Sequence, residues 1–210
     1  MSAFTASMHA GQGCAITTRL VVPRNRYDEA VEAAAATMAG IKPGDPNDAG
    51  TVCGPLISER QRERVQGYLD SATAEGGRFA CGGGRPADRD IGFFIEPTVI
   101  AGLDNSATVA REEIFGPVLT VIAHDGDDDA VRIANDSPYG LSGTVFSADD
   151  ERAAGIAARL RVGTVNVNGG VWYSADMPFG GYKQSGIGRE MGLAGFEEYL
   201  EIKAIATGAK

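Results

Sequence analysis

Cys14 is the first residue of this chain that could carry out covalent chemistry. It lies in the stretch HAGQGCAITTR, directly after Gly-Gln-Gly. A thiol nucleophile needs a base that takes up its proton and donors that stabilise the oxyanion formed on a carbonyl. Glycines leave the backbone open to close approach, and the amide of Cys14 could be one such donor. The alternative is an inert, buried thiol, which is common for free cysteines and is our interpretation of Cys53 and Cys81.

The segment EEIFGPV, residues 112–118, has the residue types of a ligand-binding loop. Two adjacent glutamates precede an apolar pair, and Gly-Pro then forces a turn before an apolar run. A carboxylate is the usual partner of a ribose diol in cofactor sites, and Phe115 could pack against a flat ring. The competing interpretation is an ordinary loop that leads into a strand with its acids in water.

A third segment, NVNGGVWYSADMPFGGYKQSG (166–186), combines paired glycines, the only tryptophan and several aromatic residues. Long loops with large apolar side chains are often functional, but these rings could equally cover a core. The following GIGREMG (186–192) has some likeness to a dinucleotide-binding glycine signature. No strand directly precedes it and its third glycine comes one position late, so we favour turn glycines.

The elements that must position these segments alternate between strand-like and helix-like patterns, without internal repeats. β-Branched or apolar runs predict strands, and segments with helix-forming composition and capping signals predict helices. Such alternation indicates an α/β fold, with a mostly parallel sheet flanked by helices. The expected strands are 17–23, 93–102 and 117–126 and one at each end of 142–168. The expected helices are 27–40, 58–77, the segment 127–140 that ends in turn residues, and one inside 142–168.

The C-terminal 25 residues form a separate pattern, a helix-like GREMGLAGFEEYL followed by a strand-like EIKAIAT. That last strand has no evident partner within the sequence. An unpaired edge is a template for pairing with another chain, so it could pair in a second subunit.

Composition excludes several classes of protein. The 210 residues are 43% hydrophobic and carry a net charge of -9, without the basic stripe of a nucleic-acid-binding protein. No apolar run approaches the roughly 20 residues of a membrane-spanning helix, so we expect no membrane partner. Three cysteines without a CxxC motif or a histidine cluster indicate free thiols in a reducing cytoplasm and no metal site.

Taken in order, these motifs resemble the NAD(P)-dependent aldehyde dehydrogenase superfamily over residues 9–205. The resemblance implies the family's catalytic domain at 1–185, and a C-terminal helix and oligomerisation strand at 186–210 that would make a homo-oligomer. The matching segments are GQGCAITTR, GPLISERQRERVQGYL, FFIEPTVI, REEIFGPVL, ANDSPYGLSGTVFS, GTVNVN and MPFGGYKQSGIGRE.

The resemblance also implies roles for single residues. Cys14 matches the catalytic thiol, which attacks an aldehyde to give a thiohemiacetal and then, after hydride leaves for NAD or NADP, a thioester that water hydrolyses. Glu113 matches the carboxylate on the nicotinamide ribose and Phe115 the ring beside it. Gln61 and Arg64 fall where the family contacts the adenosine end, Arg64 at a position where lysine is common. The residues matching the substrate funnel are Trp172, Tyr173, Asp176 and Phe179.

By the same resemblance, the chain corresponds to the C-terminal two-fifths or so of such an enzyme. We therefore expect it to lack the general-base glutamate, the second oxyanion donor and the phosphate-binding domain, and to turn over little or no aldehyde alone. Two other hypotheses stay open. One is a non-catalytic assembly fragment that pairs through its C-terminal strand. The other is a thiol hydrolase or acyltransferase using Cys14 without NAD, for which His9 and His124 are the only histidine bases.

Overall fold

The structure is a computed structural model that describes residues 1–170 and 173–208. The chain divides into two compact units, Met1–Ser137 and Pro138–Lys210, which we describe separately. This division follows packing within each unit. The expected boundary between a catalytic domain at 1–185 and a C-terminal segment at 186–210 stays a prediction.

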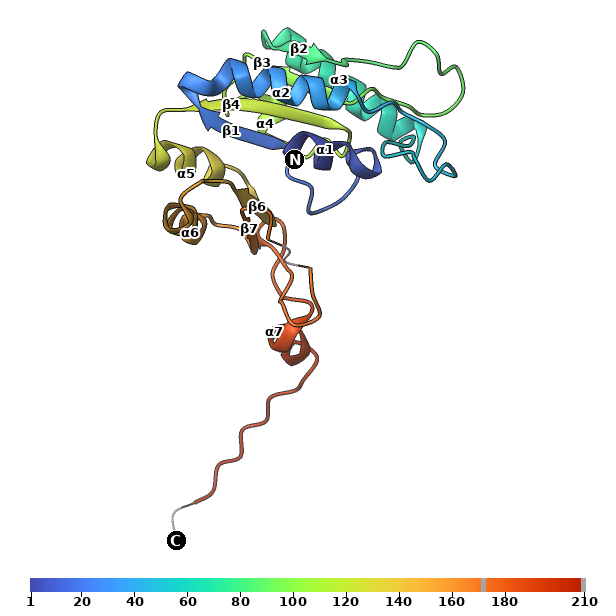
Figure 1. The fold of residues 1–210 in the computed structure, drawn as a ribbon. Coiled ribbons are helices and arrows are strands. Elements are labelled where there is room, and N and C mark those ends of the chain that lie inside the picture. The colour runs from blue at the N-terminus through green and yellow to red at the C-terminus, as the bar shows by residue number, and fades with distance from the viewer. Residues whose placement is uncertain (171–172, 209–210) are drawn as a thin grey trace. The chain divides into compact units, whose positions relative to one another are not determined.

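Unit 1 is built on a four-stranded sheet with the order β1-β4-β3-β2 (Figure 1). β1 and β3 both run parallel to β4, and β2 is antiparallel to β3. The predicted α/β class with a mostly parallel sheet is confirmed. The strands are β1 (Arg19–Pro23), β2 (Arg78–Cys81), β3 (Thr98–Ala101) and β4 (Val118–His124).

Helices cover both faces of this sheet. The helices and helical turns of unit 1 are α1 (Ser2–Ser7), η1 (Met8–Gly11), η2 (Arg24–Arg26), α2 (Tyr27–Ala39), α3 (Glu59–Ala74), α4 (Thr108–Arg111) and α5 (Asp127–Asn135). α1 and α2 pack with Val99 and Leu119 on one side, and α3, α4 and α5 pack with Ile100 and Ile122 on the other. Because both faces are covered, the central strands are apolar throughout and not alternating.

Local sequence signals explain where α3 and α2 begin. The Ser58 side chain accepts the backbone N–H of Gln61 at 3.2 Å, so Ser58, the first residue of the helix predicted over 58–77, is the N-cap of α3. Asp28 and Glu29 lie in the first turn of α2, where negative charge is favourable. The cap fixes where α3 begins, and its buried residues Val65, Leu69 and Ala72 decide which face packs in unit 1.

Two strand predictions needed correction in extent. Residues 78–81, which lie outside the strands expected from the sequence, form the edge strand β2. The strand expected over 93–102 is restricted to β3, because Pro97 cannot donate to a ladder.

Unit 2 contains a parallel β6-α6-β7 unit, as the sequence predicts, and a short antiparallel pair, β5 with β8. Asp149 caps α6 by accepting the N–H of Arg152. The elements are β5 (Tyr139–Gly140), β6 (Ser142–Val145), α6 (Asp150–Arg159), β7 (Thr164–Val167), β8 (Tyr182–Lys183) and α7 (Gly192–Glu197).

The C-terminal segment has a helix, α7, that is shorter than the predicted GREMGLAGFEEYL. Residues 201–208 have no secondary structure and are exposed. The chain is described without a second copy, so the intermolecular strand stays a prediction. Within the described ranges, no helix combines the length and the apolar character needed to cross a bilayer.

Candidate active site

Cys14 lies exposed in a turn that joins η1 to β1. The backbone upstream of Cys14 is left-handed at three consecutive residues, His9, Ala10 and Gly11, with φ of 50°, 54° and 70°. Such conformations cost a non-glycine residue on the order of 1–2 kcal/mol each and persist where surrounding contacts enforce them. No described residue accepts the amide N–H of Cys14. A thiol and an available N–H therefore occur together, as nucleophilic attack on a carbonyl requires.

The segment before Cys14 packs directly on the loop that contains Glu113 and Phe115. A Cβ atom at Gly11 would lie 1.9 Å from the carbonyl oxygen of Gly116, so only glycine fits this contact. A Cβ atom at Gly116 would lie 2.6 Å from the side chain of Val65 on α3. Gly116 is thus held between the cysteine-bearing segment and α3, and the two predicted sites of unit 1 become neighbours.

The two adjacent glutamates of this loop have different surroundings. The Glu112 carboxylate accepts the Tyr68 hydroxyl at 2.7 Å. The Glu113 carboxylate is exposed, and no described residue forms a hydrogen bond or ion pair with it. This arrangement supports the sequence-based choice of Glu113 as the carboxylate that meets a ligand, because Glu112 is already engaged.

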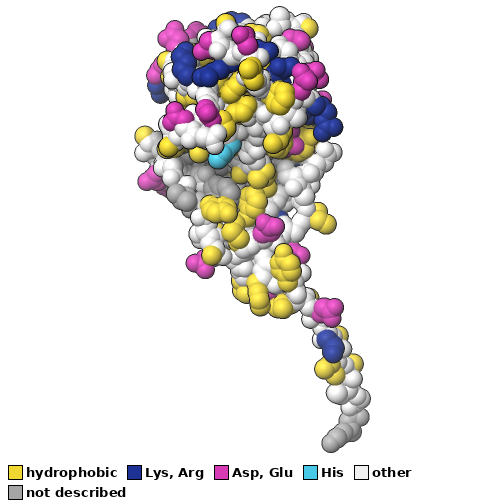
Figure 2. Space-filling model, turned by 90° about the vertical axis from the view of Figure 1, so that its right-hand side faces the viewer, with side chains coloured by type: hydrophobic (Ala, Val, Ile, Leu, Met, Phe, Trp, Pro, Cys, Tyr) yellow, Lys and Arg dark blue, Asp and Glu magenta, His cyan; other side chains and the backbone are white. Residues whose placement is uncertain are grey.

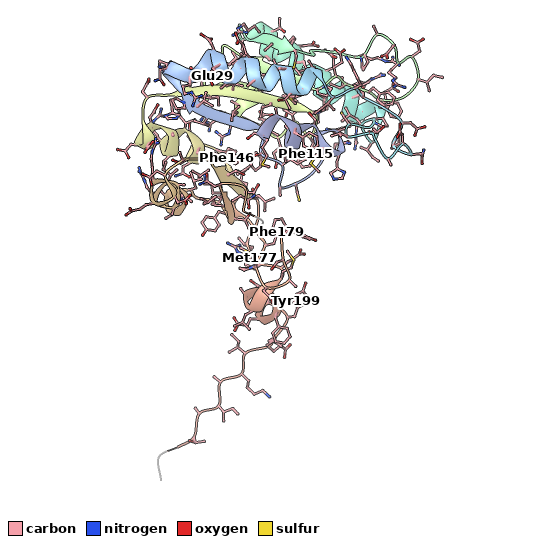
Figure 3. All side chains as sticks on the ribbon, viewed as in Figure 1. Glu29, Phe115, Phe146, Met177, Phe179 and Tyr199 are labelled. Atoms are coloured by element: carbon pink, nitrogen blue, oxygen red, sulfur yellow. The ribbon has the colours of Figure 1, made fainter. Side chains whose placement is uncertain are left out.

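Phe115 is the second exposed group on the loop. Its φ is 52°, in the left-handed region, and its side chain is 37% exposed. Figure 3 shows Phe115 close to the N-terminal helical segment of unit 1. An exposed ring next to an exposed carboxylate fits a ligand that has both a flat apolar face and hydroxyl groups.

Gln61 and Arg64 lie beside these groups and contact the backbone of the loop. The Gln61 side-chain amide donates to the carbonyl oxygens of Ile114 at 3.0 Å and Phe115 at 2.8 Å. The Arg64 guanidinium donates to the carbonyl oxygen of Glu113 at 2.7 Å. The structure therefore brings together all four residues predicted at the cofactor site.

The residues predicted to line a substrate funnel belong to unit 2. Tyr173 is 70% exposed, Asp176 is exposed and Phe179 is half-buried. The backbones of Phe179 and Glu190 exchange two hydrogen bonds of 2.7 Å, which anchors this loop within its own unit. Trp172, the fourth predicted residue, lies outside the described residues.

The other cysteines have different environments from Cys14. Cys53 is fully buried, and burial raises the pKa of its thiol to about 11. Cys81 is partly buried, and burial also raises its pKa. Both environments agree with the inert role predicted for these thiols. Among residues 1–170 and 173–208, no group of three or more His, Cys, Asp or Glu side chains could hold a metal ion.

His124 is poorly placed to serve as a base for Cys14. It ends β4, whose Thr120 pairs with Arg19 at the start of β1, five residues after Cys14. His124 therefore lies about 13 Å along the strand from the end of the sheet that is next to the cysteine segment. Its ring nitrogen Nδ1 is engaged instead with the backbone of Gly126.

Sequence analysis alone missed Tyr68 and Glu112. Tyr68 follows Gln61 and Arg64 at a spacing that places all three on one face of α3. This spacing could have drawn attention to Tyr68. The loop that the face would meet could not be known, because the loop is separated from α3 by about forty residues of chain.

Comparison with known proteins gives a consistent result. A model described as the aldehyde dehydrogenase family matches residues 1–205. Geranial dehydrogenase from Castellaniella defragrans is 46% identical over 200 residues, which cover 94% of this chain and 41% of that protein. The chain thus spans about two-fifths of the length of the curated relatives it matches.

Solved structures agree in fold over nearly the whole chain. An aldehyde dehydrogenase from Mycobacterium tuberculosis, complexed with NAD⁺, is 49% identical with a TM-score of 0.91; the match covers 94% of this chain and 41% of that one. Aldehyde dehydrogenase C from Pseudomonas syringae, a mutant complexed with NAD⁺ and octanal, is 47% identical with a TM-score of 0.93; the match covers 97% of this chain and 42% of that one.

Proposed function

Because the chain belongs to the aldehyde dehydrogenase family, we propose that it supplies the nucleophile and one part of the cofactor contact for NAD(P)-dependent oxidation of an aldehyde to a carboxylic acid. The observation that carries this proposal is the contact between Gly11 and Gly116. It joins the segment of an exposed thiol to a loop with an exposed carboxylate and an exposed ring. Few other chemistries need those three groups side by side.

In this proposal, Cys14 forms the covalent bond to substrate. Its Sγ attacks the carbonyl carbon of the aldehyde, and the carbonyl oxygen, now an oxyanion, accepts the amide N–H of Cys14. NAD(P)⁺, when bound, is the hydride acceptor that allows the resulting thiohemiacetal to become a thioester. Hydrolysis of the thioester requires a base that activates water, and residues 1–13 contain no carboxylate.

The residues of the 112–116 loop fit the nicotinamide-ribose end of such a cofactor. The Glu113 carboxylate can accept hydrogen bonds from both ribose hydroxyls, and the exposed Phe115 ring can pack beside the nicotinamide. Gln61 and Arg64 belong to the same proposed site. The complexes of NAD⁺ with the two aldehyde dehydrogenases described above support the choice of cofactor.

For the substrate, we propose an apolar or aromatic aldehyde. Tyr173 and Phe179 are aromatic, and the exposed Met177 lies between them in the same loop. Two relatives point the same way, since one is named for geranial and another was crystallised with octanal. We place the protein in the cytoplasm, because all three cysteines are free thiols.

The test combines thiol protection with cofactor reduction. We expect saturating octanal to protect Cys14 from alkylation by iodoacetamide, measured by peptide mass spectrometry, with a charged aldehyde protecting less. In the presence of NAD⁺, NADH absorbance should show at most about one equivalent per chain, because residues 1–13 supply no carboxylate that could activate water for hydrolysis of the thioester. Unprotected Cys14 would refute the proposed nucleophile, and sustained turnover would refute the need for a further base.

A second candidate function is assembly. The C-terminal segment exposes a run of large apolar side chains, and apolar groups are visible along it in Figure 2. Exposed apolar patches of this kind mark association surfaces. We propose that residues 201–207 pair with the same segment, or an equivalent one, in another subunit. The exposed members are Ile187, Leu193, Phe196, Tyr199, Leu200, Ile202 and Ile205.

A further inference from the structure

We propose that one face of α3 acts as a clamp that positions the cofactor-binding loop, and that Tyr68 and Glu112 belong to this clamp. The inference rests on the proposed role of Glu113 and Phe115 in binding the ribose end of NAD(P). The inference assigns a positioning role to Tyr68 and Glu112, which have no role in the proposed chemistry. It also means that Gln61 and Arg64 position the loop before any cofactor binds.

The clamp is made of hydrogen bonds from α3 to the loop backbone. Gln61 donates to two successive carbonyl oxygens, and Arg64 donates to the carbonyl of the residue before them. Three consecutive peptide groups, those after Glu113, Ile114 and Phe115, are therefore held by one helix. These bonds leave the Glu113 carboxylate free to face a ligand, because they use only backbone oxygens.

Tyr68 extends the clamp to the neighbouring carboxylate. Its hydroxyl accepts from Arg64 at 2.8 Å and donates to Glu112 at 2.7 Å. The Arg64 guanidinium also lies over the Tyr68 ring, 5.0 Å from its centroid. A hydroxyl between a cation and an anion forms two charge-assisted bonds, which are stronger than neutral ones. Because Tyr68 is buried, it gives Arg64 a fixed support.

The conformation of Phe115 explains why a clamp is needed. A non-glycine residue at φ 52° is strained, so a free loop would favour another backbone conformation. Gln61 bonds the carbonyl on one side of this residue and the carbonyl of the residue itself. On the other side, Gly116 is wedged between Gly11 and Val65. The exposed ring and carboxylate are thus held in place before any cofactor arrives, which lowers the entropy cost of binding.

The first arm of the test measures how readily the 112–116 loop opens in the absence of cofactor, by amide hydrogen exchange. Hydrogen exchange of the Glu112 and Val118 amides, which donate to Thr108 and Gly116 at the two ends of the loop, is followed by mass spectrometry in wild type, Gln61→Ala, Tyr68→Phe and the control Gln66→Ala. Gln66 is on the same helix but bonds only Asp70. Loss of the side-chain bonds from α3 should loosen the loop and speed the exchange of these two amides roughly five- to tenfold in the first two variants. It should leave the control within twofold of wild type.

If exchange in both Gln61→Ala and Tyr68→Phe stays within twofold of wild type, the clamp is refuted. The Tyr68→Phe variant removes a single oxygen, so it keeps this arm decisive if Gln61→Ala fails to fold. Thermal unfolding checks that the compared variants share one folded state.

The second arm separates positioning from direct contact. NAD⁺ is titrated and followed by NMR, with and without Gln61→Ala, in wild type and in a Glu113→Gln/Phe115→Ala background. Positioning predicts a loss of about fivefold in affinity in wild type and almost none in the altered loop, because the effects are not additive. Equal losses in both backgrounds would show that Gln61 contacts NAD⁺ itself and would overturn this part. Absence of any binding by wild type would refute the proposed function and leave the clamp to the exchange experiment.

Discussion

At the scale of single residues, the environment separates groups that look equivalent in the sequence. Glu112 and Glu113 are adjacent exposed acids, yet Glu112 accepts the Tyr68 hydroxyl and Glu113 has no partner among the described residues. Cys14, Cys53 and Cys81 are equally free thiols, yet they differ in burial, and burial raises the pKa of Cys53 and of Cys81. Chemical type made these residues candidates, and tertiary contacts distinguish them.

The difference between the cysteines predicts an order of alkylation. With iodoacetamide at pH 8, Cys14 should react first and Cys53 last. The pKa of about 11 leaves Cys53 about one thousandth ionised at this pH, and the side chain is fully buried. Raising the pH toward 11 should increase the thiolate fraction of Cys53. If Cys53 is still alkylated slowly at that pH, the cause is its burial.

Peptide mass spectrometry at timed intervals gives the three rates. A Cys14→Ser variant is the control, because the fast phase should vanish while the other two rates stay the same. Equal rates for Cys14 and Cys53 in the folded chain would contradict the environments described here.

At the scale of elements, an N-cap fixes where α3 begins, and glycine contacts let α3 and the cysteine segment pack against the 112–116 loop. Ser58 was expected to cap this helix, and the structure confirms it. The contact of Gly11 with Gly116 was not foreseeable, since about a hundred residues separate these glycines. The sequence predicts that the glycines of GQG leave the backbone near Cys14 open to close approach. In the structure, Gly11 gives that space to the backbone of Gly116.

This contact predicts a strong asymmetry between glycine substitutions. Gly11→Ala would force a Cβ atom into the Gly116 carbonyl at a φ of +70°, so we expect a loss of about 2–4 kcal/mol in the free energy of unfolding. Gly67→Ala is the matched control, because Gly67 lies inside α3 with nothing within 4 Å. The control should stabilise the chain by roughly 0.5–1 kcal/mol.

Urea unfolding monitored by circular dichroism measures both changes. The proposed packing of the cysteine segment on the loop would be wrong if Gly11→Ala were as stable as wild type. Thiol protection by octanal should also weaken in Gly11→Ala and remain normal in Gly67→Ala.

At the scale of the whole molecule, the chain contains two compact units and an exposed C-terminal segment. Residues 201–208 form no strand within the described chain, although their sequence has strand character. A strand needs a partner that satisfies its backbone groups, and isolated strands are not stable in water. If the proposed pairing is right, that partner is another subunit.

Deletion of residues 199–210 tests this proposal. We expect the truncated chain to have a lower mass than the full chain by light scattering at the same concentration. Substitution of Ile202 and Ile205 by Thr provides a milder variant, which keeps the length and removes exposed apolar surface. An unchanged mass in both variants would exclude the segment as the site of association.

The sequence by itself determined the α/β class, most helices, the central strands and the identity of the reactive residue types. These depend on local signals, namely periodicity, caps and the ordered motifs. Only the tertiary structure decided that β2 pairs at the sheet edge, that Glu112 and not Glu113 accepts the Tyr68 hydroxyl, and that α3 holds the loop around Phe115. Each of these depends on contacts between segments far apart in the chain, whose cost in chain entropy is offset only when the whole unit packs.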